Sequence, residues 1–312
     1  MKHALLDLLI CPKCLPNEYP LQVANQETHQ DDIITGALAC PQCQTRYPIQ
    51  EGVAFLDPQQ RQNPPTANRY EMPTVVASYL WSHFGDLLND EMATDAYQRW
   101  AQLMRPSPGN CLDGGCAVGR FAFEMAKKFD LVVGIDNSVA FIRAARQLLS
   151  QRRLDLPLPE EGLLTRLVTL ELPSDWPTAN LEFLVADAQT LPFRAGMFAG
   201  VASLNMVDKL PNPMTHLSEL NRLAKPSGAQ FLFSDPFSWS TEVAPATSWL
   251  GGTTAGPFAG HAQDNIIDLL QSRKGFLNPG WQVESHGPIW WKIRTHRNHY
   301  EMIRSCFIKA SR

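Results

Sequence analysis

The chain has 312 residues, of which 44% are hydrophobic and 19% are charged, and its formal net charge at pH 7 is −4. This length and composition support one large hydrophobic core together with a small second domain. The charge excludes a polybasic nucleic-acid-binding chain and an acidic disordered one, and no apolar run reaches the ~20 residues that a membrane span needs. Seven cysteines, four of them in two close pairs, favour a reducing, cytoplasmic compartment and a metal site over a disulfide framework.

Residues 1–57 form the first predicted domain and contain both cysteine pairs, Cys11 with Cys14 in "ICPKC" and Cys40 with Cys43 in "ACPQC". Two C-x-x-C motifs can bring four thiolates to the corners of a tetrahedron, which is the geometry of a structural zinc site. Protein ligands would fill all four positions, so none would be open to a catalytic water. The sequence therefore predicts a structural Zn²⁺ in a zinc ribbon, with a pair of redox motifs as the alternative.

The segments "LLDLLICPKC" and "LACPQCQTRYPIQEGVAFL" resemble the small zinc-ribbon family that activates RNA and protein methyltransferases. The resemblance covers residues 1–57 and implies partnership with a methyltransferase, without catalysis by the ribbon itself. Acidic residues outnumber basic ones in this segment, and an acidic surface binds phosphate weakly. We therefore expect the ribbon to pack against the catalytic domain and stabilise it.

Beyond the ribbon, residues 58–68 are polar and rich in proline and predict a linker, and residues 69–312 form the second domain. Residues 69–105 predict two helices that act as a lid, and residues 150–180 predict an insertion with one strand-like stretch, "LLTRLVTLEL". Short apolar segments alternate with helical patterns through the rest, which predicts an α/β fold with a doubly wound, mostly parallel sheet. Its strands are expected at 110–115, 131–136, 181–187, 198–205 and 228–235.

The loop after the first of these strands, "CLDGGCAVGR" at 111–120, predicts the cofactor. A dinucleotide-binding loop follows G-x-G-x-x-G, and its middle glycine lets the backbone approach the pyrophosphate. Counted from Gly114 to Gly119, the middle position here is Cys116, whose side chain would crowd a pyrophosphate. The loop therefore favours S-adenosylmethionine, whose amino-acid tail would lie over Gly115, Cys116 and Gly119.

Polar residues follow the carboxyl ends of the predicted strands, where ligands bind in doubly wound folds. From the first strand to the fourth, the predicted cofactor residues are Asp113, Asp136, Asn137, Asp187, Ala188 and Asn205. Asp113 is expected to meet the methionine ammonium, and Asp136 with Asn137 the ribose hydroxyls. Asp187 and Ala188 are expected at the adenine edge, and Asn205 beside the methyl group. An NAD enzyme and a domain of this fold that binds nothing are the alternatives.

The stretch "LDGGCAVGR" also resembles the first motif of class I methyltransferases, with Ala117 in place of a usual glycine. This replacement is costly only if the backbone at Ala117 has a positive φ angle. The resemblance implies a Rossmann-like fold with a seven-stranded sheet, and S-adenosylmethionine as methyl donor.

A second resemblance covers most of residues 66–312 and rests on "NRYE", "PEEGLLTRLVTLEL", "SLNMVDKLPNP" and "DPFSWSTEVAPATSWLGG". These segments resemble the methyltransferase domain of ovothiol-biosynthesis enzymes, which methylates an imidazole nitrogen of 5-thiohistidine, also called 4-mercaptohistidine. The resemblance implies a small-molecule methyl acceptor of this kind. Those enzymes often carry an iron-dependent sulfoxide synthase where this chain has a zinc ribbon, so another imidazole, amine or thiol acceptor stays open.

Three residues are candidates for acting on the acceptor. Asp208, just past the fourth predicted strand, and Glu71, in "NRYE", are candidate bases, needed only if the nucleophile carries a proton at neutral pH. Tyr70 can lie over the methionine end of the cofactor or over the acceptor ring, because aromatic faces attract cations such as a sulfonium. The structural alternatives are a surface ion pair for Asp208 and simple packing for Tyr70.

Two other functions stay open. Zinc ribbons fused to methyltransferase domains also occur among ribosomal RNA guanine methyltransferases, and the basic segment 292–312 can attract phosphates, which fits an RNA base methyltransferase. The acidic ribbon argues against RNA. A non-catalytic domain that binds S-adenosylmethionine and activates a partner is the other alternative. The sequence does not set the oligomeric state, and a homo-oligomer stays open.

Overall fold

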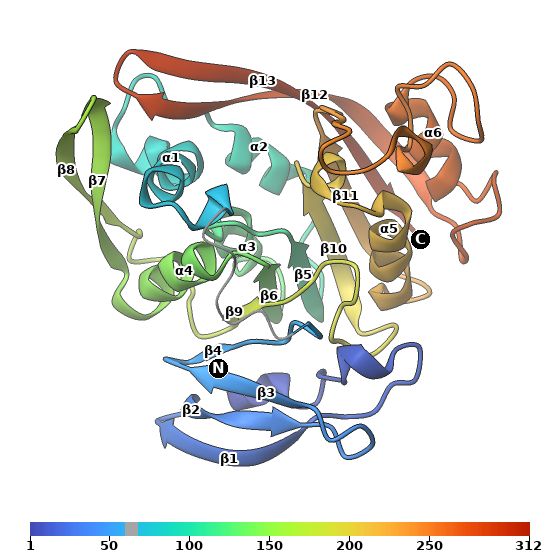
Figure 1. Ribbon diagram of the computed structural model, residues 1–312, viewed down its shortest axis with the longest axis horizontal. Helices are drawn as coiled ribbons and strands as arrows, with labels where there is room; N and C mark the ends of the chain where they lie inside the picture. The colour runs from blue at the N-terminus through green and yellow to red at the C-terminus, as the bar shows by residue number, and fades with distance from the viewer. Residues whose placement is uncertain (60–67) are drawn as a thin grey trace.

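The computed structural model describes residues 1–59 and 68–312 of the chain (Figure 1). The predicted linker, 58–68, falls mostly on residues 60–67, which lie outside the described residues. Within the described part, the chain forms a four-stranded sheet, a seven-stranded sheet and a two-stranded sheet. None of its described helices is long and apolar enough to cross a membrane.

The first sheet belongs to the ribbon and is antiparallel, in the order β1-β2-β3-β4. One cysteine pair lies at a short 3₁₀ helix, η2, and the other lies in the turn between β2 and β3. The elements are η1 (His3–Leu5), η2 (Pro12–Cys14), β1 (Gln22–His29), β2 (Asp32–Ala39), β3 (Arg46–Gln50) and β4 (Val53–Ala54).

The seven-stranded sheet has the order β12-β13-β11-β10-β5-β6-β9. Five of its strands are parallel, and β13 pairs antiparallel with both β11 and β12. The prediction of a doubly wound, mostly parallel, Rossmann-like sheet is confirmed, and the five parallel strands fall at the five predicted segments. The strands are β5 (Asn110–Gly114), β6 (Leu131–Asp136), β9 (Leu181–Val185), β10 (Phe198–Leu204), β11 (Gln230–Asp235), β12 (Gln282–His296) and β13 (His299–Ser311).

One face of this sheet packs against four helices in a single hydrophobic cluster. Strand residues such as Val132 and Phe183 meet Phe121 and Ile142 of the helices there, and all four side chains are buried. The predicted lid supplies two of these helices, so it is part of the core. The elements on this side are η3 (Arg69–Glu71), α1 (Pro73–Phe84), η4 (Gly85–Leu88), α2 (Ala96–Leu103), α3 (Arg120–Met125) and α4 (Val139–Gln151).

The opposite face packs against the ribbon and two further helices (Figure 1). Because successive strand residues point to opposite faces, Val133 and Leu184 face this side, where they share a hydrophobic cluster with Leu9 and Ile49 of the ribbon. The elements here besides the ribbon are η5 (Val207–Lys209), α5 (Pro213–Leu223), η6 (Ala246–Ser248) and α6 (Ala262–Leu270).

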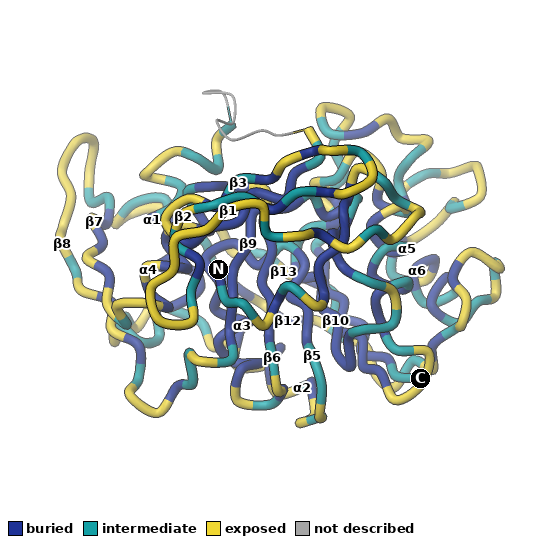
Figure 2. The backbone as a smooth tube through the Cα atoms, turned by 90° about the horizontal axis from the view of Figure 1, so that it is seen from below, coloured by how far each residue is buried: buried dark blue, intermediate teal, exposed yellow. Residues whose placement is uncertain are grey.

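The ribbon is also joined to the edge of the large sheet. Phe55, just after β4, forms a parallel bridge with Val185 of the edge strand β9, and the Leu56 N–H donates to the Val185 carbonyl at 2.7 Å. Seen from below, the outer ribbon strand β1 is exposed while the large sheet behind it is buried (Figure 2). The ribbon thus covers an edge that would otherwise offer unpaired backbone groups.

A buried ion-pair cluster adds to this contact. Arg146 of α4 pairs with Glu182 of β9 and, at 3.2 Å, with Asp32 of the ribbon. Glu182 is fully buried and also accepts from the Lys2 backbone N–H at 2.6 Å. The ribbon therefore packs against the second domain, in line with the expectation drawn from its acidic charge.

The insertion at 150–180 differs from the prediction. It contains an antiparallel hairpin of β7 (Arg153–Glu161) and β8 (Leu164–Glu171), whereas the sequence predicted one strand-like stretch. Residues 154, 156 and 158 of β7 are buried leucines at alternating positions, but Pro157 between the last two and Pro159 after them hid the pattern. Proline is tolerated there because an edge strand needs no N–H donor on its free side.

Candidate active site

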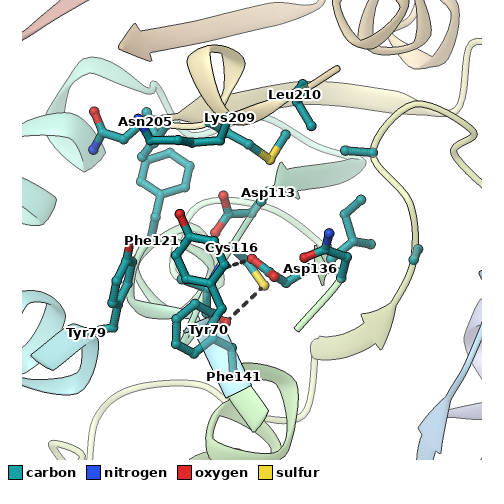
Figure 3. A pocket seen from close by; sticks show the side chains of 18 of the residues that line it. Tyr70, Tyr79, Asp113, Cys116, Phe121, Asp136, Phe141, Asn205, Lys209 and Leu210 are labelled. Carbon is teal, nitrogen blue, oxygen red and sulfur yellow. Dashed lines mark hydrogen bonds between the residues drawn. The ribbon is translucent and has the colours of Figure 1, made fainter. Parts of the chain in front are cut away.

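A cavity of about 270 Å³ opens at the carboxyl ends of β5, β6, β9 and β10 (Figure 3). Its walls come from the loops after these strands and from α1, α2, α4 and β12. The sequence-predicted residues that line it are Tyr70, Asp113, Gly115, Cys116, Asp136, Asn137, Asp187, Ala188 and Asn205.

The loop after β5 is shaped by left-handed backbone angles. Gly115 has φ +83°, and a Cβ there would collide with the Met206 side chain, so only glycine fits. Ala117 also has a positive φ, 47°, so the position where the class I motif usually has glycine does carry the strain of a left-handed alanine. Asp136 offsets part of this cost, because its Oδ2 accepts from the Ala117 N–H at 2.9 Å.

Two carboxyl groups lie beside this loop, of which Asp113 is buried and Asp136 is half-buried. Asp113 is 1% exposed, and its Oδ2 has no hydrogen-bond partner among the described residues. Burial, reinforced by the Asp136 carboxylate, raises the pKa of Asp113 to about 8. Burial also raises the pKa of Asp136 to about 6, although backbone N–H groups of Ser138 and Ala117 oppose the shift. Burial thus disfavours the ionised form of Asp113, and a cationic ligand such as an ammonium group would stabilise that form.

The loop after β9 forms another wall through Asp187 and Ala188. A histidine of α5 holds it: His216 Nδ1 donates to the Ala188 carbonyl, and its Nε2 accepts from Ser203 Oγ, both at 2.9 Å. Burial lowers the pKa of His216 to about 4, so the ring is neutral and can play both roles at once. The same loop contacts the ribbon further on, where the Ile10 N–H donates to the Pro192 carbonyl at 3.0 Å.

Asn205 lies directly after β10, in a left-handed conformation with φ +57°. Its Oδ1 accepts from Ser305 Oγ at 2.5 Å, and Ser305 in turn accepts from the Trp291 Nε1–H at 2.9 Å. These two hydrogen bonds fix the Asn205 amide, and its Nδ2 has no partner anywhere in residues 1–59 and 68–312. A buried donor without a partner is costly unless a ligand accepts from it.

Aromatic rings make up another part of the cavity lining, and Tyr70, Tyr79, Phe121 and Phe141 are seen in Figure 3. Phe141 and Tyr79 have ring centroids 4.7 Å apart, Tyr79 and His83 5.9 Å, and His83 and Tyr97 4.0 Å. Tyr70 closes one end, 6.0 Å from Tyr79 in an edge-to-face arrangement. Such a wall suits a flat ring or a cation, which aromatic faces attract.

Three predicted site residues lie outside the cavity wall. Glu71, a predicted base, accepts from the Val139 and Ala140 N–H groups at 3.0 Å each and so caps α4. Asp208, the other predicted base, is buried beside the cavity, where it accepts from Lys209 Nζ at 3.0 Å and from the Ser238 N–H at 2.8 Å. Both carboxylates are thus engaged with neighbouring groups outside the cavity wall, and their role as bases stays a prediction.

Gly119 is the third predicted residue outside the cavity wall. It precedes α3 as its N-cap with φ +89°, and a Cβ there would approach the Phe183 ring to 2.5 Å. Close packing of the helix on the sheet therefore requires glycine here, and its contact with the cofactor stays a prediction.

Sequence reasoning missed most of the aromatic side. His83, Tyr79 and Tyr97 all line the cavity, and they come from α1 and α2. The available signal was "ASYLWSHF", a helical segment of large rings that ends in a histidine and a phenylalanine and is more apolar than an exposed lid needs.

The four ribbon cysteines gather as predicted. Their Sγ atoms all lie within 4.8 Å of one another, with Cys11 to Cys43 at 3.6 Å and Cys14 to Cys40 at 3.8 Å. A tetrahedral site with Zn–S bonds of about 2.3 Å needs sulfur atoms about 3.8 Å apart. The donor set and spacing therefore fit such an ion.

Comparison with known proteins supports both parts of the chain. Residues 112–232 match the family described as "Methyltransferase domain", and residues 2–52 match the family described as "Trm112p-like protein". No curated protein matches the chain in sequence.

Several solved structures are similar in fold. A chain from a Haloferax volcanii complex that contains the Trm112 methyltransferase activator is 14% identical with a TM-score of 0.47, over 79% of this chain and 99% of that chain. A structure from work on echinomycin biosynthesis is 20% identical with a TM-score of 0.45, over 70% and 80% of the two chains. A SAM-dependent methyltransferase from Aquifex aeolicus is 13% identical with a TM-score of 0.43, over 77% and 97%. At these values, the similarity carries no argument about the acceptor.

Proposed function

We propose that this S-adenosylmethionine-dependent methyltransferase transfers the methyl group to a ring nitrogen of 5-thiohistidine or a related imidazole compound. The observation that carries the proposal is the aromatic wall of Phe141, Tyr79, His83 and Tyr97, which lines the same small cavity as the acidic cofactor side. The resemblance of residues 66–312 to the ovothiol-type methyltransferase domain supports the same acceptor.

The cofactor side fits the donor on its own geometry. The Oδ2 atom of Asp113 offers a buried carboxyl oxygen to the methionine ammonium, and Asp136 at the end of β6 has lone pairs left for ribose hydroxyls. When bound, S-adenosylmethionine supplies an activated methyl group on a sulfonium. The chain then needs chiefly to position the acceptor in line, and positioning alone can supply about 7–11 kcal/mol.

The acceptor side fits a small flat ring better than a nucleic acid. The aromatic rings exclude water and offer stacking surfaces, while the Asn205 Nδ2–H can donate to a polar atom of the acceptor.

Methyl transfer from labelled S-adenosylmethionine, with 5-thiohistidine, L-histidine and total RNA as separate acceptors, tests the proposal. We expect label on 5-thiohistidine, and a lower rate or none on L-histidine. Label on RNA alone, with binding that weakens steeply as salt rises, would instead identify an RNA methyltransferase. Label on none of the three, with the donor bound, would leave the methyltransferase and reject the imidazole acceptor.

We also propose that Cys11, Cys14, Cys40 and Cys43 hold a structural Zn²⁺. The ribbon shares a hydrophobic cluster with the large sheet, so loss of the metal is expected to lower the unfolding temperature of the whole chain. Elemental analysis should find equimolar zinc, which Cys40→Ser should abolish. Cys306→Ser, outside the cluster, is the matched control and should keep the metal.

A further inference from the structure

The aromatic wall contains one group that can exchange a proton with the acceptor. His83 lies near the end of α1, lines the cavity and is 4% exposed. Its Nε2 and the Tyr97 hydroxyl oxygen are 2.6 Å apart. Its Nδ1 is buried and has no hydrogen-bond partner in the part of the chain that the structure describes. A buried ring nitrogen of this kind, in the wall of a ligand cavity, is available to a ligand.

The surroundings keep this imidazole neutral. Burial, together with the Arg120 guanidinium of α3, lowers the pKa of His83 well below its usual value. The other titratable groups that face it are Tyr79 on its own helix and Tyr97 of α2, and burial raises the pKa of both phenols above the usual range. Arg120 is itself paired with Asp86 at 2.6 Å and with Glu124 at 3.0 Å. One ring nitrogen of His83 therefore lacks a proton at neutral pH.

The hydrogen bond between Nε2 and Tyr97 determines which ring nitrogen of His83 lacks the proton. If Nε2 carries the proton, it donates to the Tyr97 oxygen, and Nδ1 is a bare acceptor without a partner among the described residues. If Tyr97 donates to Nε2 instead, Nδ1–H becomes a donor and would compete for a ring lone pair that methyl transfer needs. Asn205 already supplies a donor to the same cavity for a polar atom of the acceptor other than the attacking nitrogen, so His83 can supply the acceptor that a ring N–H requires.

We propose that Nδ1 of His83 accepts the ring N–H of the methyl acceptor and removes its proton during transfer, with Tyr97 fixing the imidazole. The proposal rests on the proposed function and narrows its substrate class to azoles that carry a ring N–H. It also replaces Asp208 and Glu71 as the proton acceptor.

The step balances in atoms and charge. The lone pair of one ring nitrogen forms the N–CH₃ bond while the S–CH₃ bond of the sulfonium breaks and leaves its electron pair on sulfur. The ring becomes cationic, and the proton on its other nitrogen passes to Nδ1 of His83. Solvent takes this proton when the product leaves, which restores the neutral imidazole.

Kinetics with paired acceptors test the step. The first acceptor is 5-thiohistidine, and the second is its derivative in which the non-reacting ring nitrogen is already methylated and has no proton to lose. His83→Asn places an amide near the position of Nδ1 and can accept a hydrogen bond but cannot take a proton. We expect kcat to fall about 100-fold on the first acceptor and less than threefold on the second, with KM for S-adenosylmethionine unchanged. Equal losses on both acceptors would show that His83 only packs the wall, and would overturn the proposal.

A spectroscopic measurement decides the point without turnover. In protein labelled with ¹⁵N at histidine, two-bond ¹⁵N–¹H correlations separate protonated from bare ring nitrogens, and His83→Asn identifies the His83 signals. We expect a bare Nδ1 whose signal shifts when imidazole, as a probe, is added with S-adenosylhomocysteine. A protonated Nδ1, or a signal that saturating imidazole leaves unmoved, would overturn the proposal. If no imidazole compound is methylated, the proposed function fails, and this spectrum still decides the role of His83.

Discussion

The two sides of the cavity are built from different parts of the fold. The cofactor side consists of loops that leave the parallel strands, and its polar groups include two carboxyls with raised pKa values, the buried Asp113 and the half-buried Asp136. The acceptor side consists of rings on α1, α2 and β12, such as Tyr79, Tyr97 and Trp291, and its titratable histidine is neutral. The loops of the parallel strands thus place acidic groups on one side. The elements α1, α2 and β12 place flat apolar rings on the other.

This difference implies that the two sides can change independently. The sheet fixes where a cofactor binds, because every strand delivers its loop to the same edge. The acceptor is read by side chains from helices that pack on the sheet, so substitutions there can alter specificity while the cofactor site stays intact. The predictions below are designed to separate the two sides or to show that they are coupled.

The largest effect is expected on the cofactor side. Asp136→Ala removes the carboxylate at the end of β6 and should weaken S-adenosylmethionine binding about 100-fold or more, because two charge-assisted hydrogen bonds are lost. Calorimetric titration measures this, and thermal unfolding tests whether the fold survives, since Asp136 also accepts from Ala117 and Ser138. An affinity within a few-fold of the parent, in folded protein, would mean that the ribose lies elsewhere.

A smaller effect is expected on the acceptor side. Trp291→Phe keeps an aromatic ring but loses the hydrogen bond to Ser305, which positions Asn205. The KM for the acceptor should rise about 10-fold, equivalent to about 1.4 kcal/mol, while the affinity for S-adenosylmethionine stays within twofold.

The matched control for this change is Trp281→Phe. Trp281 donates through Nε1 to Asn221 at 2.8 Å on the other face of the sheet, so its loss costs a buried hydrogen bond of the same kind. It should lower stability without changing either binding constant. A loss of cofactor affinity in Trp291→Phe that the control does not show would mean that the two sides are coupled through Asn205.

The sequence predicts residues of the cofactor side more completely than residues of the acceptor side, for a physical reason. Asp113, Asp136 and Asn205 could be assigned because each lies at or next to the end of an apolar strand, and the fold brings those ends together. The ribbon cysteines could be predicted from the sequence equally well, because two local motifs contain all four.

The acceptor wall could not be assigned in the same way. Tyr97 and Trp291 lie far apart in the chain and meet only because β12 and α2 pack on the same face, which no local pattern encodes. The contacts of Glu71, a predicted base, could not be foreseen for the same reason. Its sequence position shows a carboxylate near an aromatic residue, whereas only the tertiary structure shows the α4 terminus that occupies it.

The pH dependence of the free energy of unfolding tests the raised pKa of Asp113 on the cofactor side. Burial and Asp136 raise the pKa of Asp113 to about 8 in the folded chain, above the unfolded value of 3.8. The folded state therefore binds more protons than the unfolded state between these values, and the free energy of unfolding falls as pH rises through them. Between pH 6 and 8, Asp113→Asn should be less steep than the parent by on the order of 1 kcal/mol per pH unit. Equal slopes in denaturant unfolding would show that the Asp113 carboxyl is ionised throughout.

The smallest effect is expected for a substitution at Glu71. This substitution tests whether Glu71 takes part in the reaction or only caps α4. Glu71→Gln removes the negative charge at the start of α4 but keeps one oxygen that can accept from the backbone, so we expect a loss of roughly 1 kcal/mol in stability and a kcat within threefold of the parent. Ser138→Ala is the matched control, because Ser138 Oγ caps the same helix by accepting from the Phe141 N–H at 3.2 Å. If both variants lose similar stability and keep their turnover, Glu71 acts on the helix. A fall in kcat of about 100-fold in Glu71→Gln alone would return the carboxylate to the reaction and remove the need for His83 as the base.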